Sequence, residues 1–244
     1  MNTALPTAPA PIPHLGDSRH TMAQPPQPQR PKRAGPGPVK KGYLILYNAA
    51  SAVAWLTVLG RVIGTLYVRD WNPAFVPIVA DRFTRITQTF AVIEILHAIF
   101  GIVPAPVMTT VMQVASRLVL VWGITFPFPA LAGSAWYSSM LCAWSLTEVM
   151  RYGYFALKQV DFVPYWLHWL RYSGFLILYP IGISSEVAMI LKAVSGPASQ
   201  VGPWYPAVLG AILLSYIPGS VILYSHMLKQ RRKQLRGGAA KKDE

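Results

Sequence analysis

Long apolar stretches alternate with short polar or proline-bearing connections between residues 43 and 228. Each stretch is close to the roughly 20 mainly apolar residues that cross a bilayer as a helix. The stretches cover residues 43–66, 86–103, 107–125, 135–157, 165–191 and 204–228. This pattern predicts an all-α polytopic membrane protein, a six-transmembrane-helix bundle, in which the polar residues 67–85 connect the first two helices.

Composition supports the membrane interpretation and divides the chain into three parts. Apolar residues make up 53% and charged residues 13%, whereas a soluble domain carries about 25% charged residues. Residues 1–42 contain ten of the 22 prolines and too little apolar bulk to form a core, so we expect a disordered basic tail there. Residues 43–228 form the predicted membrane domain, and residues 229–244 form a second basic tail.

The charge distribution predicts the orientation of the chain. Residues 1–42 hold six Lys/Arg against one Asp, and residues 229–244 hold seven against two acidic residues. A basic protein can bind nucleic acid, but here the basic residues flank an apolar body, which favours a membrane and no nucleic acid. With an even number of spans, the positive-inside rule places both termini in the cytosol.

Six charged residues lie within the predicted spans, where a charge is costly and therefore a functional candidate. They are Glu94, Arg117, Glu148, Arg151, Arg171 and Glu186. Three acids and three bases predict internal pairing, and Glu148 and Arg151 are three residues apart on one helix. Glu94 fits a structural partner that fixes helix packing at least as well as a chemical role. Arg151 and Arg171 could extend to the interface or meet an anionic head group, and both interpretations stay open.

The fifth predicted span has an unusual pattern. Tyr179 and Glu186 are seven residues apart, which puts them within about 20° of one helix face and roughly 10 Å apart along the axis. Pro180 and Gly182 favour a bend between them. A broken helix at membrane depth is tolerated where it is buried or lines a cavity. The residues alone allow a phenol and a carboxyl acting together, or an aromatic packing residue beside a hinge with one satisfied glutamate.

Several kinds of site have no support in the sequence. Cys142 is the single cysteine, so neither an internal disulfide nor a cysteine-based metal cluster can form. No pair of histidines has metal-ligand spacing, and no glycine-rich phosphate loop is present. We therefore expect no metal and no cofactor.

Short motifs in a fixed order make the chain similar to one family over nearly all of residues 43–236. They are Leu46-Tyr-Asn48, Glu94-Ile-Leu-His97, Gly101-Ile-Val-Pro104, Gln113-Val-Ala-Ser-Arg117, Trp144-Ser-Leu-Thr-Glu148-Val-Met-Arg151-Tyr152, Leu170-Arg171-Tyr172, Leu178-Tyr179-Pro180-Ile-Gly182, Ser184-Ser-Glu186, Tyr216-Ile-Pro218 and His226-Met227. The sequence resembles the endoplasmic-reticulum 3-hydroxyacyl-CoA dehydratases of very-long-chain fatty acid elongation, also called protein tyrosine phosphatase-like proteins. It departs from them at Ser173-Gly174, where Asn and a bulkier residue are expected.

The resemblance implies an activity and a site. Tyr179 and Glu186 would be the active-site pair, and the supporting or substrate-binding residues would be Arg117, Arg151, Arg171 and Gly182. The reaction would remove water from a (3R)-3-hydroxyacyl-CoA to give a trans-2-enoyl-CoA. The family also implies the endoplasmic reticulum membrane as location, and a condensing enzyme and two reductases of elongation as partners. A phosphatase activity has no support in these residues.

The implied chemistry suits these residue types. β-Elimination needs a base for the proton on C2 and an acid for the hydroxyl leaving C3. We favour Glu186 as base and Tyr179 as donor, with the reverse assignment as the alternative. The CoA phosphates need basic partners nearer the cytosol, for which Arg151, Lys158 and Arg171 are the candidates.

The C-terminal residues and two other function classes complete the expectations. Lys241-Lys242-Asp243-Glu244 resembles a dilysine retrieval signal, which agrees with a cytosolic C-terminus in the endoplasmic reticulum. A non-catalytic scaffold or lipid-binding protein would have the same helical body, but it has no need of both Tyr179 and Glu186. A transporter would show inverted repeats with paired broken helices, and no internal repeat is visible.

Overall fold

The structure, a computed structural model, describes residues 37–240. The expected tail up to residue 36 and the retrieval signal at residues 241–244 lie outside the described residues. Regular structure in the described part is helical throughout, which confirms the all-α prediction. The longer helices are α1 (Pro38–Val68), α2 (Val76–Phe90), α3 (Val92–Ile99), α4 (Val107–Leu118), α6 (Ala135–Gln159), α7 (Tyr165–Ser173), α8 (Phe175–Val194) and α9 (Tyr205–Ala240). The short ones are η1 (Pro73–Phe75), the π-helical η2 (Val119–Thr125), α5 (Pro129–Ala132) and η3 (Pro197–Gln200).

Four helical segments are long and apolar enough to cross a membrane. They are α1, α4 continued by η2, α8, and α9 as far as Leu235. The protein is therefore a multi-pass membrane protein. The other two predicted spans are also helical. However, α2 and α3 are only 15 and 8 residues long, and α6 carries charged and polar side chains along its length. Length and composition alone thus support four spans where the apolar pattern predicted six.

The polar stretch predicted to connect the first two spans is largely helical. Helix α2 begins at Val76, well before the predicted start of the second span at residue 86. Its charged residues pair on the helix, because Arg85 Nη2 lies 3.2 Å from Asp81 Oδ2 one turn away. The hydroxyl of Tyr137 on α6 also donates to Asp81 Oδ1 at 3.0 Å. Both contacts satisfy the Asp81 carboxylate within the predicted connection.

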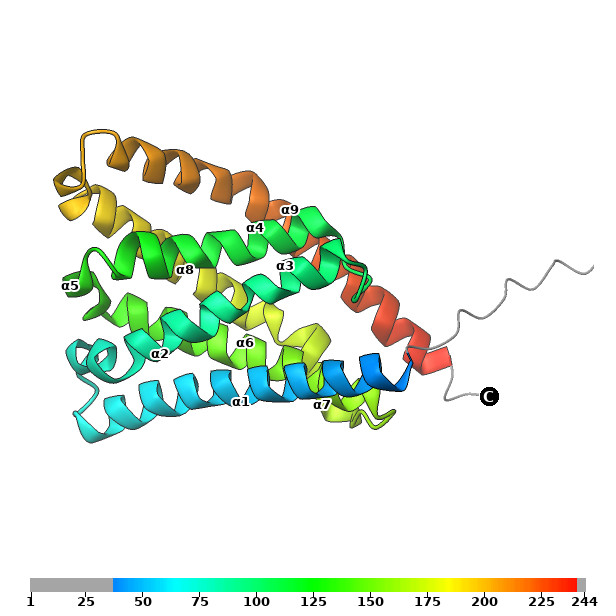
Figure 1. The fold of residues 1–244 in the computed structure, drawn as a ribbon. Coiled ribbons are helices and arrows are strands. Elements are labelled where there is room, and N and C mark those ends of the chain that lie inside the picture. The colour runs from blue at the N-terminus through cyan, green and yellow to red at the C-terminus, as the bar shows by residue number, and fades with distance from the viewer. Residues whose placement is uncertain (1–36, 241–244) are drawn as a thin grey trace, which may run out of the picture. The chain divides into compact units, whose positions relative to one another are not determined.

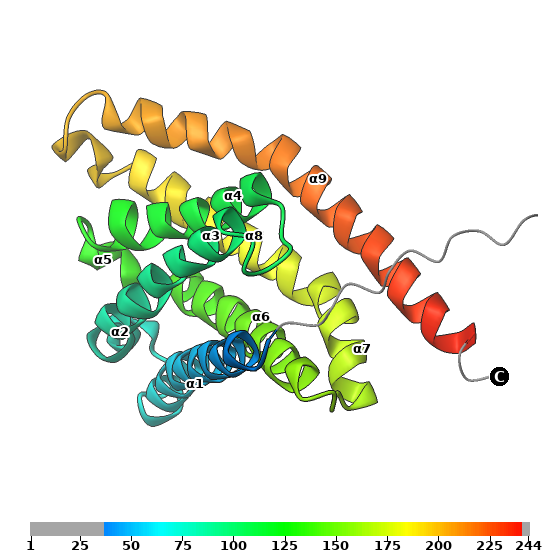
Figure 2. The same ribbon diagram turned by 45° about the vertical axis from the view of Figure 1, so that its right-hand side comes forward.

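Helix α6 packs between α1 and α8, and these three helices form most of the core (Figure 1). Buried core residues are Trp55, Val58 and Val62 of α1, Tyr137, Met140, Leu141 and Trp144 of α6, and Met189, Ile190 and Ala193 of α8. Helix α9 packs against α8 and α7 (Figure 2). Helix α1 begins, and α9 ends, at the end of this bundle where α7 lies (Figure 1).

The outward side of α9 is almost entirely apolar and uncovered. Only 6% of its most apolar window is buried, and Leu214, Ile217 and Val221 are exposed. A soluble monomer rarely shows an apolar patch of this size. Lipid chains would cover this side of the helix in a bilayer.

The fifth predicted span is interrupted at Gly174, and α8 continues as a helix through Pro180. A Cβ on Gly174 would lie 2.9 Å from the carbonyl oxygen of Leu170 and 3.0 Å from Met150 Cε. The absence of a side chain at Gly174 therefore lets α6 approach the junction of α7 and α8. The sequence predicted the bend at Pro180 and Gly182, whereas packing against α6 interrupts the helix six residues earlier.

Candidate active site

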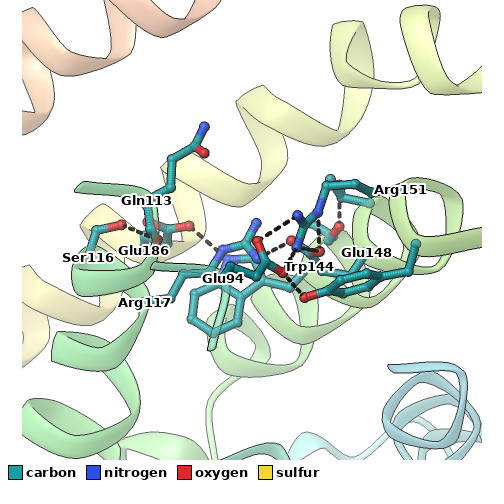
Figure 3. Close-up of polar contacts among 11 residues, drawn as sticks. Glu94, Gln113, Ser116, Arg117, Trp144, Glu148, Arg151 and Glu186 are labelled. Carbon is teal, nitrogen blue, oxygen red and sulfur yellow. Dashed lines mark hydrogen bonds and ion pairs between the residues drawn. The ribbon is translucent and has the colours of Figure 1, made fainter. Parts of the chain in front are cut away.

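Four charged side chains from three helices form one partly buried ionic cluster, in which Glu148 is buried (Figure 3). Arg151 of α6 donates from both terminal nitrogens to the Glu94 carboxylate of α3, at 2.7 and 2.8 Å. Its Nε donates to Glu148 Oε2 at 2.6 Å. Arg117 of α4 donates to the other oxygen of Glu148. The cluster thus holds two acids and two bases, as the predicted internal pairing requires, and it confirms the contact between Glu148 and Arg151.

The cluster gives Glu94 and Arg151 a structural role. The Glu94 carboxylate accepts from Arg151 and from the hydroxyl of Tyr152, so it ties α3 to α6. All three nitrogens of the Arg151 guanidinium donate to carboxylates. Two carboxylates therefore hold Arg151 and neutralise its charge. Breaking such a buried network is strongly destabilising, because it leaves an uncompensated charge.

The Glu186 carboxylate of α8 lies beside this cluster but outside it. Trp144 Nε1 donates to Glu186 Oε1 at 2.8 Å, and the Tyr216 hydroxyl donates to Oε2 at 2.9 Å. Glu186 is 9% exposed, and no basic side chain among the described residues forms an ion pair with it. The Arg117 guanidinium lies 5.3 Å from the centre of the Trp144 ring. The Trp144 indole therefore separates the ionic cluster from the carboxylate that it binds.

Tyr179 lies on the same helix as Glu186 and also faces α9. Its hydroxyl donates to the carbonyl oxygen of Ser220 at 3.2 Å, and its ring stacks on Tyr224 with centroids 5.7 Å apart. The partners of Glu186 and Tyr179 on α9, Tyr216 and Ser220, are one helical turn apart. The phenol and the carboxyl therefore contact positions of α9 that are one turn apart. No direct hydrogen bond joins the phenol to the carboxyl.

Gly182 and Arg171, the two other predicted supporting residues, lie apart from the ionic cluster. Gly182 is buried on α8 where that helix packs on α6, and an added Cβ would lie 3.8 Å from Ala143 Cβ, an ordinary contact. Arg171 is on α7, and its guanidinium lies over the rings of Phe155 and Tyr172 at 5.8 and 5.7 Å. Of the predicted residues, Arg117 and Arg151 thus come together, while Arg171 lies separately.

Trp144 and Tyr216, the two donors to Glu186, were not predicted as site residues. Trp144 had a detectable signal, because it lies one turn before Glu148 on a helix that carries a stripe of polar side chains. Tyr216 had none. Its contact depends on how α8 and α9 pack, and no spacing along the chain shows this.

An apolar cavity of about 410 Å³ opens on another side of α8. Its lining comes from α1, α6, α8 and the segment after α1, namely Ile63, Leu66, Trp71, Pro73, Ala135, Ser138, Ser139, Cys142, Ala143, Leu146, Leu178 and Ile181. Leu178 and Ile181 flank the turn of α8 that carries Tyr179. Within residues 37–240 no group of His, Cys, Asp or Glu side chains is suited to hold a metal ion.

This arrangement can transfer protons without a metal. A carboxyl with two neutral donors and a phenol two turns away can remove one proton and supply another. The fold and this pair define a multi-pass helical membrane protein with a candidate acid–base site between its last two long helices.

Comparison with known proteins identifies the family. Residues 88–237 match the sequence model of the protein tyrosine phosphatase-like protein family, PTPLA, and the chain belongs to this family. It is 44% identical to a probable very-long-chain (3R)-3-hydroxyacyl-CoA dehydratase of Schizosaccharomyces pombe, over 84% of this chain and 98% of that protein.

More distant relatives carry the same name. The very-long-chain (3R)-3-hydroxyacyl-CoA dehydratase PASTICCINO 2 of Arabidopsis thaliana is 38% identical over 81% of this chain and 94% of that protein. The very-long-chain (3R)-3-hydroxyacyl-CoA dehydratase 2 of Mus musculus is 34% identical over 84% of this chain and 85% of that protein. No solved structure matches this chain.

Proposed function

We propose that this chain dehydrates (3R)-3-hydroxyacyl-CoA to trans-2-enoyl-CoA, with Tyr179 and Glu186 as its catalytic residues. The names of its curated relatives in fungi, plants and animals support the reaction. One observation supports the residues. Tyr179 and Glu186 face the same helix, α9, where their partners Ser220 and Tyr216 are one turn apart. A substrate between the two groups would have C2 near one and C3 near the other.

The proposed steps balance in atoms and protons. The Glu186 carboxylate takes the proton from C2, and the electron pair of that C–H bond forms the double bond between C2 and C3. The C–O bond at C3 breaks, and the Tyr179 hydroxyl gives its proton to the departing oxygen, so the leaving group is water. Transfer of a proton from Glu186 to the Tyr179 phenolate restores both groups. The reverse assignment uses the same two side chains and remains the alternative.

The supporting residues orient the catalytic groups and take no part in the reaction themselves. Arg117 covers one face of the Trp144 ring and binds Glu148, so it fixes the indole that donates to Glu186. Arg151 holds Glu148 in turn. Gly182 lies between the levels of the two catalytic groups, where α8 meets α6. These three are positioning residues, since none of them is proposed to touch the reacting atoms.

We further propose that all six predicted spans cross the membrane and that both termini are cytosolic. Helices α2–α3 and α6 run alongside segments long enough to cross, and α1 begins at the end of the bundle where α9 ends (Figure 1). Within the described residues, Lys40 and Lys41 lie at the start of α1, and Lys229, Arg231, Arg232 and Lys233 lie towards the end of α9, as the positive-inside rule requires. The endoplasmic reticulum would be the location, and the condensing enzyme and reductases of elongation would be the partners.

The decisive experiment is an assay of the purified chain in detergent with a long-chain 3-hydroxyacyl-CoA, following the conjugated enoyl product. Tyr179→Phe and Glu186→Gln should each reduce kcat by about 10²–10⁴-fold, the usual contribution of one positioned proton-transfer group. The double variant should be little worse than the slower single one, because groups that act as a unit are not additive.

Two matched variants serve as controls. Tyr224→Phe removes the hydroxyl of the neighbouring tyrosine, which stacks on Tyr179 but makes no side-chain hydrogen bond in the described part of the chain. It should retain activity. Glu94→Gln changes a carboxylate of the ionic cluster and should be milder than Glu186→Gln. Near-normal product formation by folded Tyr179→Phe and Glu186→Gln would refute this mechanism and favour the scaffold.

A further inference from the structure

A second group of basic side chains lies where α6, α7 and α9 meet, apart from the ionic cluster. Arg171 of α7 has a buried Nε with no acceptor among the described residues, and no carboxylate in that part of the chain forms an ion pair with it. A buried donor left without a partner is costly. Either water or a bound anion must therefore satisfy the Arg171 guanidinium.

Two further cations border the same surface. Arg231 reaches from α9 to α7, where its Nε donates to Ser173 Oγ at 3.2 Å. Lys158, near the end of α6, lies 5.8 Å from the centre of the Tyr154 ring. That ring is 6.0 Å from the Tyr172 ring, over which Arg171 lies. Lys158 and Arg171 thus border one group of aromatic rings, and Arg231 bonds to the residue that follows Tyr172. None of the three cations forms an ion pair among the described residues.

We infer that Arg171, Arg231 and Lys158 bind the phosphates of the CoA head group. This inference rests on the proposed function, because it concerns the same substrate. Guanidinium groups suit phosphate oxygens, which they can bind with two parallel hydrogen bonds. Of the basic residues that the sequence suggested for this role, Arg151 is excluded by its own carboxylate partners. Arg231 takes its place.

The spacing along α7 and α8 suits a CoA thioester. Tyr179 and Glu186 follow Arg171 by 8 and 15 residues, which corresponds to about 12 and 22 Å along the helices. Twelve bonds join the diphosphate to the sulfur of CoA. Four peptide residues contain the same number of backbone bonds, so the extended distance from the diphosphate to the sulfur is roughly 14 Å. C2 and C3 follow directly after the thioester carbon. With its diphosphate bound at Arg171, the thioester would therefore have C2 and C3 at a distance along the helices that lies between those of Tyr179 and Glu186.

A phospholipid head group has similar phosphate chemistry, so the experiment must separate the two ligands. The full chain, purified in a neutral detergent, is assayed with a 3-hydroxyacyl-CoA and with the pantetheine thioester of the same acyl chain, which lacks the nucleotide and its phosphates. The variants are Arg231→Gln and Lys158→Gln. Arg232→Gln is the matched control, because Arg232 is exposed and turned about 100° away on the same helix.

Arg231→Gln should raise KM for the CoA thioester about tenfold with little change in kcat, as the loss of one charged hydrogen bond would. Lys158→Gln should have a smaller effect in the same direction. Neither variant should change KM for the pantetheine thioester, and Arg231→Lys should recover part of the loss. Arg232→Gln should behave like the unchanged protein with both substrates.

Three results would overturn the inference. KM for both substrates could rise equally in Arg231→Gln, or KM for the CoA thioester could stay unchanged. Alternatively, phosphatidylserine in the micelles could abolish the difference between the two substrates, which would assign the surface to lipid head groups. Failure of the unchanged protein to dehydrate either substrate is a different result, because it would overturn the proposed function itself.

Discussion

Tyr216 provides the sharpest test of how Glu186 is held. Its hydroxyl donates one of the two hydrogen bonds to the carboxylate, at 2.9 Å, and Trp144 donates the other at 2.8 Å. Tyr216→Phe removes that donor and keeps the ring that packs between α8 and α9. A hydrogen bond to a charged group contributes about 1.5–3 kcal/mol. If it serves to position the carboxylate, kcat should fall by about tenfold to 100-fold, less than in Glu186→Gln.

The assay is a comparison of four proteins in the enoyl-product assay: unchanged, Tyr216→Phe, Glu186→Gln, and the double variant. Because Tyr216 is proposed to act through Glu186, the Tyr216 change should have almost no further effect once Glu186 is Gln. KM should change less than kcat in the Tyr216 variant. Independent, additive losses from Tyr216→Phe and Glu186→Gln would refute the positioning role, as would an unchanged kcat in Tyr216→Phe.

Two further predictions concern stability and topology. Glu148→Gln leaves Arg117 and Arg151 without their shared carboxylate and should destabilise the fold by about 3–5 kcal/mol, seen as a lower Tm in detergent. Asp161→Asn, at the exposed Lys41 pair, should leave Tm unchanged. A tag after residue 244 should be accessible without permeabilising the organelle, and Lys241→Ser with Lys242→Ser should release some protein to later compartments. A tag reached only after permeabilisation would contradict the proposed topology.

Contacts within one helix could be predicted from the sequence, but contacts between helices could not. The pair Glu148–Arg151 follows from a spacing of three residues. The pair Arg151–Glu94 joins residues 57 apart, and it depends on the approach of α3 to α6. The common face of Tyr179 and Glu186 was predictable in the same way as the first pair. Their hydrogen-bond partners come from α6 and α9, which no pattern along α8 indicates.

Two boundaries were predicted less well, for physical reasons. Residues 67–85 were expected to be a polar connection, but on a helix Asp81 pairs with Arg85 and accepts a hydrogen bond from Tyr137, so α2 includes both charged residues. A proline suggested where the fifth span would break. The interruption lies instead at Gly174, where an added Cβ would lie 3.0 Å from Met150 Cε of α6. Proline and glycine in the sequence thus predicted that this span would be interrupted, but the position of the interruption depends on contacts with another helix.

The position of α9 has a consequence for how the protein is made. The cluster of Glu94, Arg117, Glu148 and Arg151 comes from α3, α4 and α6, all of which are synthesised before α9. Both α9 contacts of the proposed catalytic pair, to Tyr216 and Ser220, come from a helix that is synthesised later than these three. A chain that stops before α9 can therefore assemble its ionic cluster but lacks half of the site. If the proposed site is right, such a truncated chain should be inactive even when its ionic cluster is intact.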